Sequence, residues 1–591
     1  MSAFDQESRL KAVLQTANGA YDQGLALSQG VINVGFEGLY NKYDELKRIT
    51  WNDLGVEMDA ELLPSRILIP GDLGMNLAKI HHQIRFKSGY IRNVNNTVNI
   101  DLTDWMIAVV CDLDMQFIDR NPDDESETER KQREFIEREF DIPGDYRIDR
   151  FADGIYSTAA NWNHFDMDNS RFINPDTGRE WSFDDWADHD NYTATMFSMM
   201  CSSWARSMQA AGLTTLGVQL SLPDLTETPT FTPTTVIHQI YPYRGQDGKA
   251  ETGFTPRGNS NSFLYLEMVK DEEGNDGVLP DAKQVAFSGN FCYPGAGSTP
   301  AMDGTFIISH KLFMERYLVP VTQAVNVSLT SAIRLINNSP FGWVVPLRIG
   351  TDPDYPDPNH EIHKFSRSED GKSYVFRKVR PQQFGPESYN GRWLKVNHDS
   401  ITTTAVTWDE GSDARITISG NIGYFQHNQL STTEDFLGVI GWSKLTVSGL
   451  WSIKIQVSAE DGALVIGLAP GAELSINIEV DTDKTANMPY PLVELPFIQQ
   501  WMELFLQARV QAVVASLQKS FSGKHQFVQP GSGQLDFSEP KFNYNGDLIS
   551  SVKHKAFTGE KVMVPARTIM KLEPLDDPES KTIDVVYKEA E

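Results

Sequence analysis

The sequence predicts an α+β fold in which long antiparallel sheets curl around long helices, in two elongated halves. One observation is a strand of unusual length. Between residues 445 and 457, apolar or small residues hold all odd positions and polar residues most even ones. At about 3.3 Å per residue this strand would extend roughly 43 Å, whereas strands average about 5–6 residues. The second observation is the wide apolar stripe of a predicted helix at 495–521. A long twisted sheet must cover its apolar face, and packing a long helix against it is one solution.

The N-terminal half, residues 1–225, begins with a helical pattern. Apolar residues recur every three to four positions over 6–45, which predicts one long helix or two shorter ones. Alternating segments within 83–117 then predict strands. They precede a charged insertion at about 119–145, which we expect to be an exposed loop with a short surface helix. A helix rich in Met and ending at Gly212 completes this half.

The C-terminal half, residues 226–591, follows a connection rich in Pro and Thr near 221–235. It contains a β-rich block, mostly between 400 and 490, and then the helix at 495–521. A sheet rolled around that helix would enclose an elongated apolar interior. Such an interior is a core if side chains fill it, and a groove for an apolar ligand if they do not.

Composition limits the classes of partner. The chain has 591 residues, 80 of them acidic and 52 Lys or Arg, so its net charge is −28. This charge favours a soluble protein and disfavours binding to nucleic acid or simple docking on anionic lipid. Neither a spanning segment nor a secretory signal is recognisable, so we expect a cytoplasmic protein, with release by a non-standard route left open. The widely spaced Cys111, Cys201 and Cys292 predict buried free thiols.

Motifs for catalysis and metal binding are not found in the sequence. There is no nucleophile elbow, P-loop or dinucleotide-binding fingerprint. His360 and His363 are three residues apart and do not match the HExxH metal motif. Asp166 and Asp168 begin like a calcium loop, but Arg171 stands where the turn glycine is needed. We therefore expect no enzyme activity, no catalytic residue, no metal site and no cofactor.

Four segments resemble a known family. They are "DLTDWMIAVVCDLD" (101–114), "GDYRIDRFADGIYSTAANWNHF" (144–165), "SFLYLEMVKD" (262–271) and "GTFIISHKLFMERYLVP" (304–320). The chain resembles the TULIP superfamily of tubular lipid-binding proteins, and within it the OrfX-type accessory proteins of neurotoxin gene clusters. The resemblance implies a helix-in-rolled-sheet fold and no catalytic motif. It also implies either lipid binding or assistance to a partner protein or toxin.

The functional expectation is non-catalytic binding of a lipid or similar apolar ligand in an elongated apolar groove. The alternative is an accessory or structural protein that engages a partner protein and fills the groove with its own side chains. Soft apolar side chains near the open end of a roll are the candidate ligand-binding residues, although each could equally be core. They are Met196, Met200, Trp204, Trp501, Phe505 and Leu506.

Membrane contact is expected to be transient at most. The best basic patch contains Lys372, Arg377, Lys378 and Arg380. Each Lys or Arg near anionic lipid contributes about 1 kcal/mol, so four could sustain weak, salt-sensitive binding. The alternative is that these charges only balance nearby carboxylates.

Overall fold

The computed structural model describes most of the chain. The described residues are 2–53, 55–71, 79–93, 98–118, 155–174, 177–211, 215–220, 233–271, 273–295, 301–328, 359–389, 391–460, 462–486, 495–521, 527–529 and 533–554, with shorter pieces between them and at 562–563.

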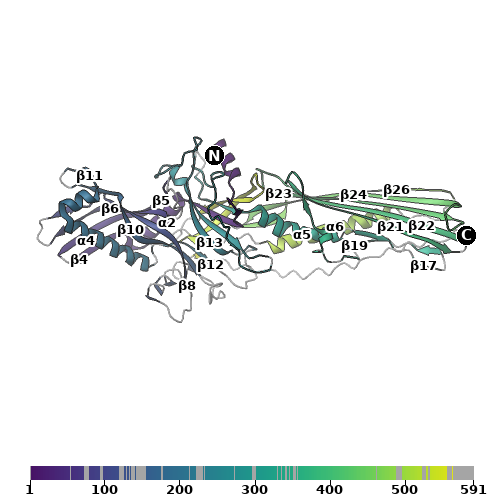
Figure 1. Cartoon of the computed structure of the whole chain (residues 1–591), viewed down its shortest axis with the longest axis horizontal. Coiled ribbons are helices and arrows are strands. Elements are labelled where there is room, and N and C mark those ends of the chain that lie inside the picture. The colour runs from purple at the N-terminus through teal and green to yellow at the C-terminus, as the bar shows by residue number, and fades with distance from the viewer. Residues whose placement is uncertain are drawn as a thin grey trace. The chain divides into compact units, whose positions relative to one another are not determined.

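Two compact units make up the chain (Figure 1). Unit 1 comprises Met1–Ser309, Ala459–Leu464 and Ser522–Ile569, and unit 2 comprises His310–Ser458 and Val465–Phe521. Residues 226–309, which the sequence assigned to the C-terminal half, thus lie in unit 1. Most of the charged insertion predicted at 119–145 lies outside the described residues.

Unit 1 is built on one large sheet whose described strand order is β13-β14-β3-β15-β29-β28-β27-β12-β10-β8-β6-β5-β4, with β11 and β7 added beside β10 and β6. Its longest strands are β5 Val56–Leu68, β6 Lys79–Asn93, β8 Met106–Ile118 and β10 Ile155–Ile173, and the shorter β4 Arg48–Asp53 pairs with β5. The others are β3 Gln23–Ser28, β7 Asn99–Asp101, β11 Glu180–Trp181, β12 Thr215–Leu220, β13 Pro233–Tyr241, β14 Ser262–Val269, β15 Gly304–Ile308, β27 Phe527–Gln529, β28 Gly533–Phe542 and β29 Leu548–His554.

Small pairs stand apart from this sheet. They are β1 Gln15–Thr16 with β2 Gly19–Ala20, and β9 Phe140–Asp141 with β30 Val562–Met563. The helices of unit 1 are α1 Ala3–Lys11, α2 Gln29–Lys42 and α4 Phe183–Ala210, with short 3-10 turns η1 Asp44–Leu46 and η3 Gly258–Ser260. α2 contacts β5, and α4 contacts β10 and β6.

The N-terminal region contains two shorter helices, one of the two alternatives predicted over 6–45, but also strand structure between them that was not predicted. α1 and α2 are separated by β3, whose six residues are all buried. β3 lies between β14 and β15 in the sheet. Ser28 ends the strand and begins the helix, because its Oγ accepts a hydrogen bond from the Val31 N–H at 3.2 Å.

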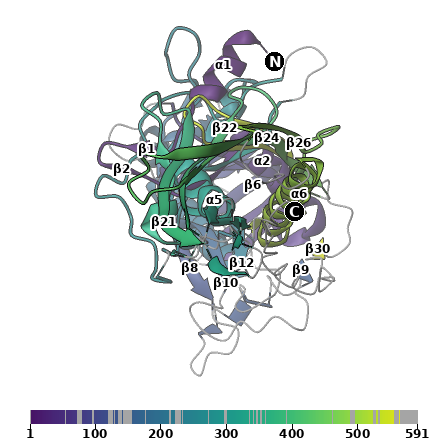
Figure 2. The same ribbon diagram turned by 90° about the vertical axis from the view of Figure 1, so that its right-hand side faces the viewer.

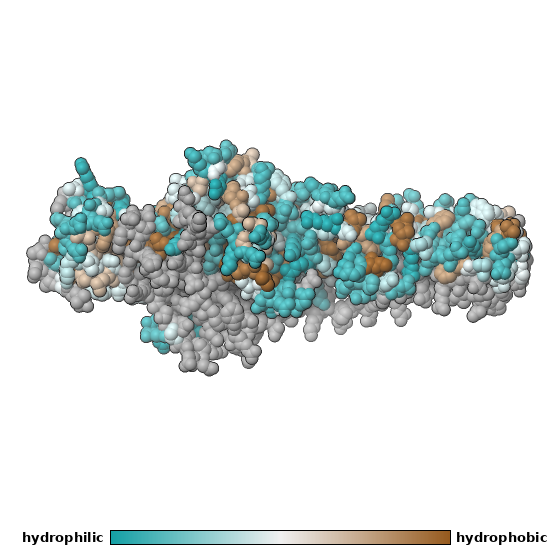
Figure 3. All heavy atoms as spheres, viewed as in Figure 1, coloured by the Kyte–Doolittle hydropathy of each residue, from teal (hydrophilic) through white to brown (hydrophobic). Residues whose placement is uncertain are grey.

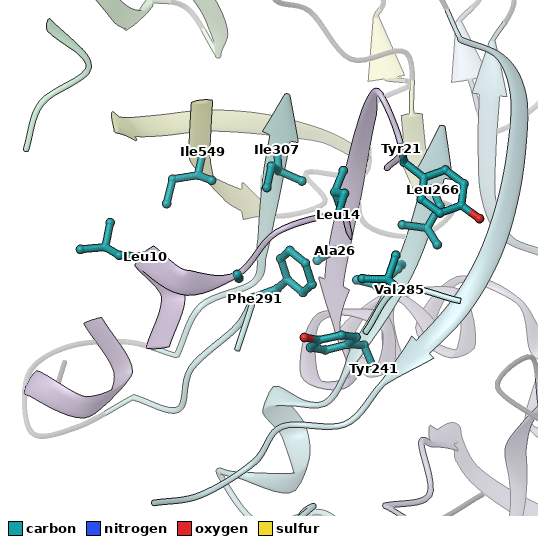
Figure 4. Packing of buried hydrophobic residues seen from close by; sticks show 12 residues of the cluster. Leu10, Leu14, Tyr21, Ala26, Tyr241, Leu266, Val285, Phe291, Ile307 and Ile549 are labelled. Atoms are coloured by element: carbon teal, nitrogen blue, oxygen red, sulfur yellow. The ribbon is translucent and has the colours of Figure 1, made fainter. Parts of the chain in front are cut away.

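One hydrophobic cluster shows how distant segments meet in unit 1 (Figure 4). Its buried members come from α1, the strands of the central sheet and the loops beside them. They are Leu10, Ala12, Leu14, Tyr21, Ala26, Tyr241, Leu264, Leu266, Val285, Phe291, Ile307 and Ile549.

Unit 2 contains a second sheet, with strand order β20-β21-β22-β23-β24-β25 and β26 paired to β24. The strands are β20 Ser366–Arg367, β21 Ser373–Tyr389, β22 Arg392–Trp408, β23 Arg415–Ser431, β24 Val439–Glu460, β25 Ala463–Leu468 and β26 Ser475–Lys484. The strand predicted at 445–457 is real, and β24 extends beyond it at both ends. Its odd-numbered residues alternate with more exposed even-numbered ones as predicted.

The helices of unit 2 lie on one side of this curved sheet (Figure 2). They are the π-helix η4 Lys311–Leu318, which continues into α5 Val319–Ser328, and α6 Leu495–Ser520, with a 3-10 turn η5 Glu361–His363. α5 contacts β22 and α6, and α6 contacts β26. Two hairpin pairs complete the unit: β16 Thr330–Ile333 with β19 Leu347–Gly350, and β17 Ile336–Ser339 with β18 Gly342–Val344.

The predicted fold class is confirmed. The protein is mixed α+β and rich in long antiparallel sheets, with helices packed against them, which is consistent with a TULIP-like fold.

A lower pH should reduce the free energy of unfolding through the buried His82 of unit 1. This side chain is buried, and its ring centroid lies 5.1 Å from that of Phe36. Burial lowers the pKa of His82 to about 3. The unfolded chain therefore binds this proton first, and the free energy of unfolding should fall from about pH 6.5 downward, by about 1–2 kcal/mol at pH 5. His82→Phe should reduce this loss in denaturant titrations at pH 7 and pH 5. The exposed His189→Phe is the control, and an equal effect of both changes would contradict the assignment.

Candidate functional site

Three of the predicted ligand-binding residues lie on α4 in unit 1. Met196 and Met200 are buried, and Trp204 is half-buried. The same helix carries Phe197, whose ring meets that of Trp105 edge-on with centroids 5.5 Å apart. This part of α4 thus contributes to a packed aromatic cluster against the sheet.

The other three predicted residues lie on α6 in unit 2. Leu506 is buried, and Phe505 is half-buried with the Arg509 guanidinium 5.3 Å from its ring centroid. The side chain of Trp501 lies outside the described residues. The predicted set is therefore divided between two units, and a ligand-binding role for any of its members stays a prediction.

A more extensive candidate is the inner face of the second sheet. We define it as the even-numbered positions of β21, β22, β23 and β26 and the odd-numbered positions of β24, which are the more buried side in each strand. Its apolar part is formed by β23, β24 and β26. The buried apolar residues there include Ile416, Ile418, Ile422, Leu445, Val447, Ile453, Ile455, Val457 and Ile478.

Strand β22 adds a polar part to the same face. Four successive inward positions hold His398, Ser400, Thr402 and Thr404, all buried, while the outward Ile401 is 38% exposed. Polar side chains are usually exposed and large apolar ones buried. This part of β22 shows the opposite arrangement, which makes the inner face a candidate site. Sequence reasoning missed this stretch because polar residues occupy both of its faces. Only the pairing with β23 shows which side is enclosed.

Hydrogen bonds connect part of this polar surface. The Tyr424 hydroxyl donates to Gln426 Oε1, Gln426 Nε2 donates to Asn428 Oδ1 at 2.9 Å, and Asn428 Nδ2 donates to Ser443 Oγ at 3.2 Å. The ring of His398 lies with its centroid 4.6 Å from that of Tyr424. These groups satisfy one another, as buried polar groups must.

A second row of the inner face is not satisfied in this way. Thr404, Gly420 and Trp451 stand opposite one another on three adjacent strands. Thr404 and Trp451 are 0% and 3% exposed, yet Thr404 Oγ1 and Trp451 Nε1 have no hydrogen-bond partner among the described residues. An unpaired buried polar group costs about 1–3 kcal/mol. In this row the Trp451 indole N–H can donate a hydrogen bond to a bound polar atom, and the Thr404 hydroxyl can donate or accept one.

The predicted basic patch is divided between two faces by the strand period. Arg377 is exposed on the outer face, whereas Lys378 and Arg380 lie at inward, half-buried positions. Lys378 Nζ lies 5.7 Å from the ring centroid of Tyr355, and Arg380 pairs with Asp354.

Another predicted member of the patch, Lys372, is 3.4 Å from a carboxylate oxygen of Glu410. For Lys372 and Arg380, the alternative that nearby carboxylates balance the positive charges therefore holds.

Groups with potential acid–base chemistry gather where η4 meets β21. The Tyr374 hydroxyl donates to Glu315 Oε1 at 2.9 Å and lies 2.7 Å from His310 Nε2. Burial, together with the Glu315 carboxylate, raises the pKa of Tyr374, so the phenol stays protonated at neutral pH. The ring of His310 also lies against Trp408, with centroids 4.9 Å apart. This arrangement fits a structural network.

Within the described part of the chain, no three His, Cys, Asp or Glu side chains are grouped to hold a metal ion. His363, one of the two histidines considered above, is buried, and its Nε2 lies 2.8 Å from the Tyr355 carbonyl oxygen. Cys201 and Cys292 are buried free thiols, and burial raises the pKa of both. The Cys111 side chain falls outside the described residues.

None of the described helices is long and apolar enough to cross a membrane. Figure 3 shows a mostly hydrophilic face with small apolar patches.

Known proteins resemble this chain only distantly. No family model and no curated protein matches the chain. P47 of Clostridium botulinum E1 is 10% identical, with 90% of this chain and 98% of that chain covered and a TM-score of 0.37. P47 of C. botulinum A2 is also 10% identical, with 90% and 97% covered and a TM-score of 0.38. A lipopolysaccharide binding protein is 9% identical, with 91% and 99% covered and a TM-score of 0.27. At these values the likenesses carry no argument about ligand or activity.

A methyl group at Gly420 should disturb the inner face. A Cβ there would lie 2.5 Å from Trp451 Nε1 and 2.6 Å from the Thr403 carbonyl oxygen. Gly420→Ala should therefore lower the free energy of unfolding by about 1–3 kcal/mol, measured by denaturant titration. Gly423→Ala on the same strand is the matched control, because its Cβ would meet nothing closer than 3.7 Å, and its effect should stay within about 0.5 kcal/mol. Equal effects would show that the Trp451 ring does not pack over Gly420.

Proposed function

We propose that the protein binds a lipid or similar apolar molecule, without catalysing a reaction on it, at the inner face of the second sheet. The observation that carries the proposal is the row of Thr404, Gly420 and Trp451. In this row two buried polar groups, which have no hydrogen-bond partner within the described part of the chain, stand beside a large apolar surface. A ligand with a long apolar part and a small polar group has the chemistry to match both.

The apolar part of the face would supply most of the affinity. Burying a methylene group contributes about 0.8 kcal/mol, and the Ile and Val side chains of β23, β24 and β26 offer such contacts along their length. The hydroxyl of Thr404 and the indole N–H of Trp451 would orient the ligand by its polar end. A carbonyl oxygen can accept from the indole, and a hydroxyl can exchange hydrogen bonds with Thr404.

Binding without catalysis is supported by the state of the reactive side chains. The described thiols are buried and protonated, and Tyr374 is held as a neutral donor. Neither described thiol is therefore a ready nucleophile, because the thiolate is the reactive form. We also propose that contact with membranes is transient at most, because a net charge of −28 opposes approach to an anionic leaflet.

An accessory role is the second candidate, and a specific observation favours it. Side chains of unit 2 already occupy part of the helix-covered side of the sheet. The Tyr317 hydroxyl donates to the Leu517 carbonyl oxygen at 3.0 Å, and the rings of Phe313 and Phe521 meet edge-on at 5.8 Å. If such packing fills the whole interior, the outer surface would instead engage a partner protein.

Ligand content separates the two candidates. Native mass spectrometry of purified protein, before and after organic extraction, should show a released apolar molecule, and the extracted protein should take up a fluorescent fatty acid. Absence of both released lipid and uptake would contradict the binding proposal and favour the accessory role.

Removing one hydroxyl should test where the ligand binds. Thr404→Val keeps the side-chain shape and removes Oγ1, so fatty-acid affinity should fall about tenfold through one lost hydrogen bond. Stability without ligand should be unchanged or higher, because an unpaired buried group is lost. The matched control is Thr403→Val, the next residue on the outer face of β22, which should change neither quantity. Uptake that is equal in both variants would place the ligand elsewhere.

A further inference from the structure

Two arginines of unit 1 lie close together on neighbouring strands. Arg66 of β5 stands opposite Gln83 of β6, and Arg85 follows two residues later. Arg66 Nε donates to Gln83 Oε1 at 2.8 Å, and its guanidinium carbon lies 3.5 Å from the ring centroid of Phe254. Arg85 donates from Nε and Nη2 to the Pro64 carbonyl oxygen, at 3.1 and 2.7 Å. Both guanidinium groups are thus held in place by neutral partners.

Their neighbours on the same strands are arranged differently. Three other cations, on β4 and β6, are each paired with a carboxylate of β5. The pairs are Arg48 with Asp59, Lys87 with Glu61 at 3.0 Å, and Arg92 with Glu57 at 2.7 Å. Arg66 and Arg85 make no ion pair in the part of the chain that the structure describes, although acidic residues outnumber basic ones in the sequence. Two neighbouring arginines without an ion pair among the described residues are therefore a local exception.

The closeness of the two charges has an energetic cost. Partial burial, and then the charge of Arg85, lower the pKa of Arg66 to about 10. Partial burial likewise lowers the pKa of Arg85, and the charge of Glu37 opposes this effect without forming an ion pair with Arg85 among the described residues. An anion placed between the two guanidinium groups would relieve their repulsion.

We propose that Arg66 and Arg85 together bind the phosphate group of a ligand. Because each is anchored through Nε, Arg66 keeps both Nη groups, and Arg85 keeps Nη1, for hydrogen bonds to oxygen. A tetrahedral phosphate has enough acceptor oxygens for donors arriving from two guanidinium groups, which recognise it through charge-assisted hydrogen bonds. Phe254 covers one face of Arg66 and limits the directions from which water can reach it. This site is in unit 1 and does not depend on the function proposed for the second sheet.

Calorimetric titration of the full chain with inorganic phosphate at low ionic strength tests the site. Arg66→Gln and Arg85→Gln should each weaken binding at least about tenfold, since each removes charge-assisted hydrogen bonds. Arg92→Gln is the matched control: it makes the same charge change on β6, at a residue already paired with Glu57, and should leave phosphate affinity within about twofold. Thermal unfolding checks that each variant is folded. If Arg66→Gln does not fold, Arg66→Lys replaces it in the test. This change keeps the positive charge but removes the planar guanidinium, so the variant should bind phosphate more weakly than the parent chain.

Vesicle flotation identifies the source of the phosphate. Binding to phosphatidylglycerol vesicles over phosphatidylcholine vesicles, lost in Arg66→Gln but not in Arg92→Gln, would assign a lipid headgroup. Phosphate binding without vesicle binding would assign a soluble phosphate ester. Failure of the parent chain to bind either probe would overturn the proposal. So would equal losses in Arg66→Gln and Arg92→Gln, or acetate binding as tight as phosphate binding.

Discussion

The two-residue period of the long strands decides what the second sheet encloses. Because successive side chains point to opposite faces, the pairing of β22 with β23 places Thr402 and Thr404 inside and Ile401 outside. A shift by one residue would exchange the two sets and bury Ile401 in place of the hydroxyls. The register is held by apolar residues elsewhere on the face, such as the buried Val406 of β22 opposite the buried Ile418 of β23. Apolar packing between β22 and β23 thus fixes the inward position of the polar groups on β22.

Sequence patterns predicted the parts of the fold in which that period is visible. The alternation over 445–457 gave the correct strand and buried face, and the helix at 495–521 corresponds to α6. In the N-terminal segment the alternative of two shorter helices is present as α1 and α2, but strand β3 between them was missed because all six of its residues are buried. A strand enclosed on both faces has no two-residue period. Its neighbours β14 and β15 come from far along the chain, so no local signal shows that it belongs to a sheet.

For the candidate sites, too, local sequence patterns show single residues but not the residues that strand pairing brings beside them. Apolar helix positions such as Leu506 were easy to select, yet burial alone does not distinguish a ligand-binding residue from core. Thr404 was not selected because its significance depends on Gly420 and Trp451, which reach it only through strand pairing. The pairing of Arg66 with Gln83 follows an irregularity in register between Leu63 and Arg66. Spacing along the sequence does not reveal which residues such an irregularity brings together.

The central sheet of unit 1 has a consequence for synthesis. Strand β15 pairs on one side with β3 and on the other with β29, whose residues are Leu548–His554. At about 5–20 residues per second, a ribosome reaches β29 on the order of tens of seconds after it has made β15. During this interval one edge of β15 lacks its native neighbour, and exposed strand edges are prone to pair with other chains. Completion of this sheet therefore waits until β29 has been synthesised.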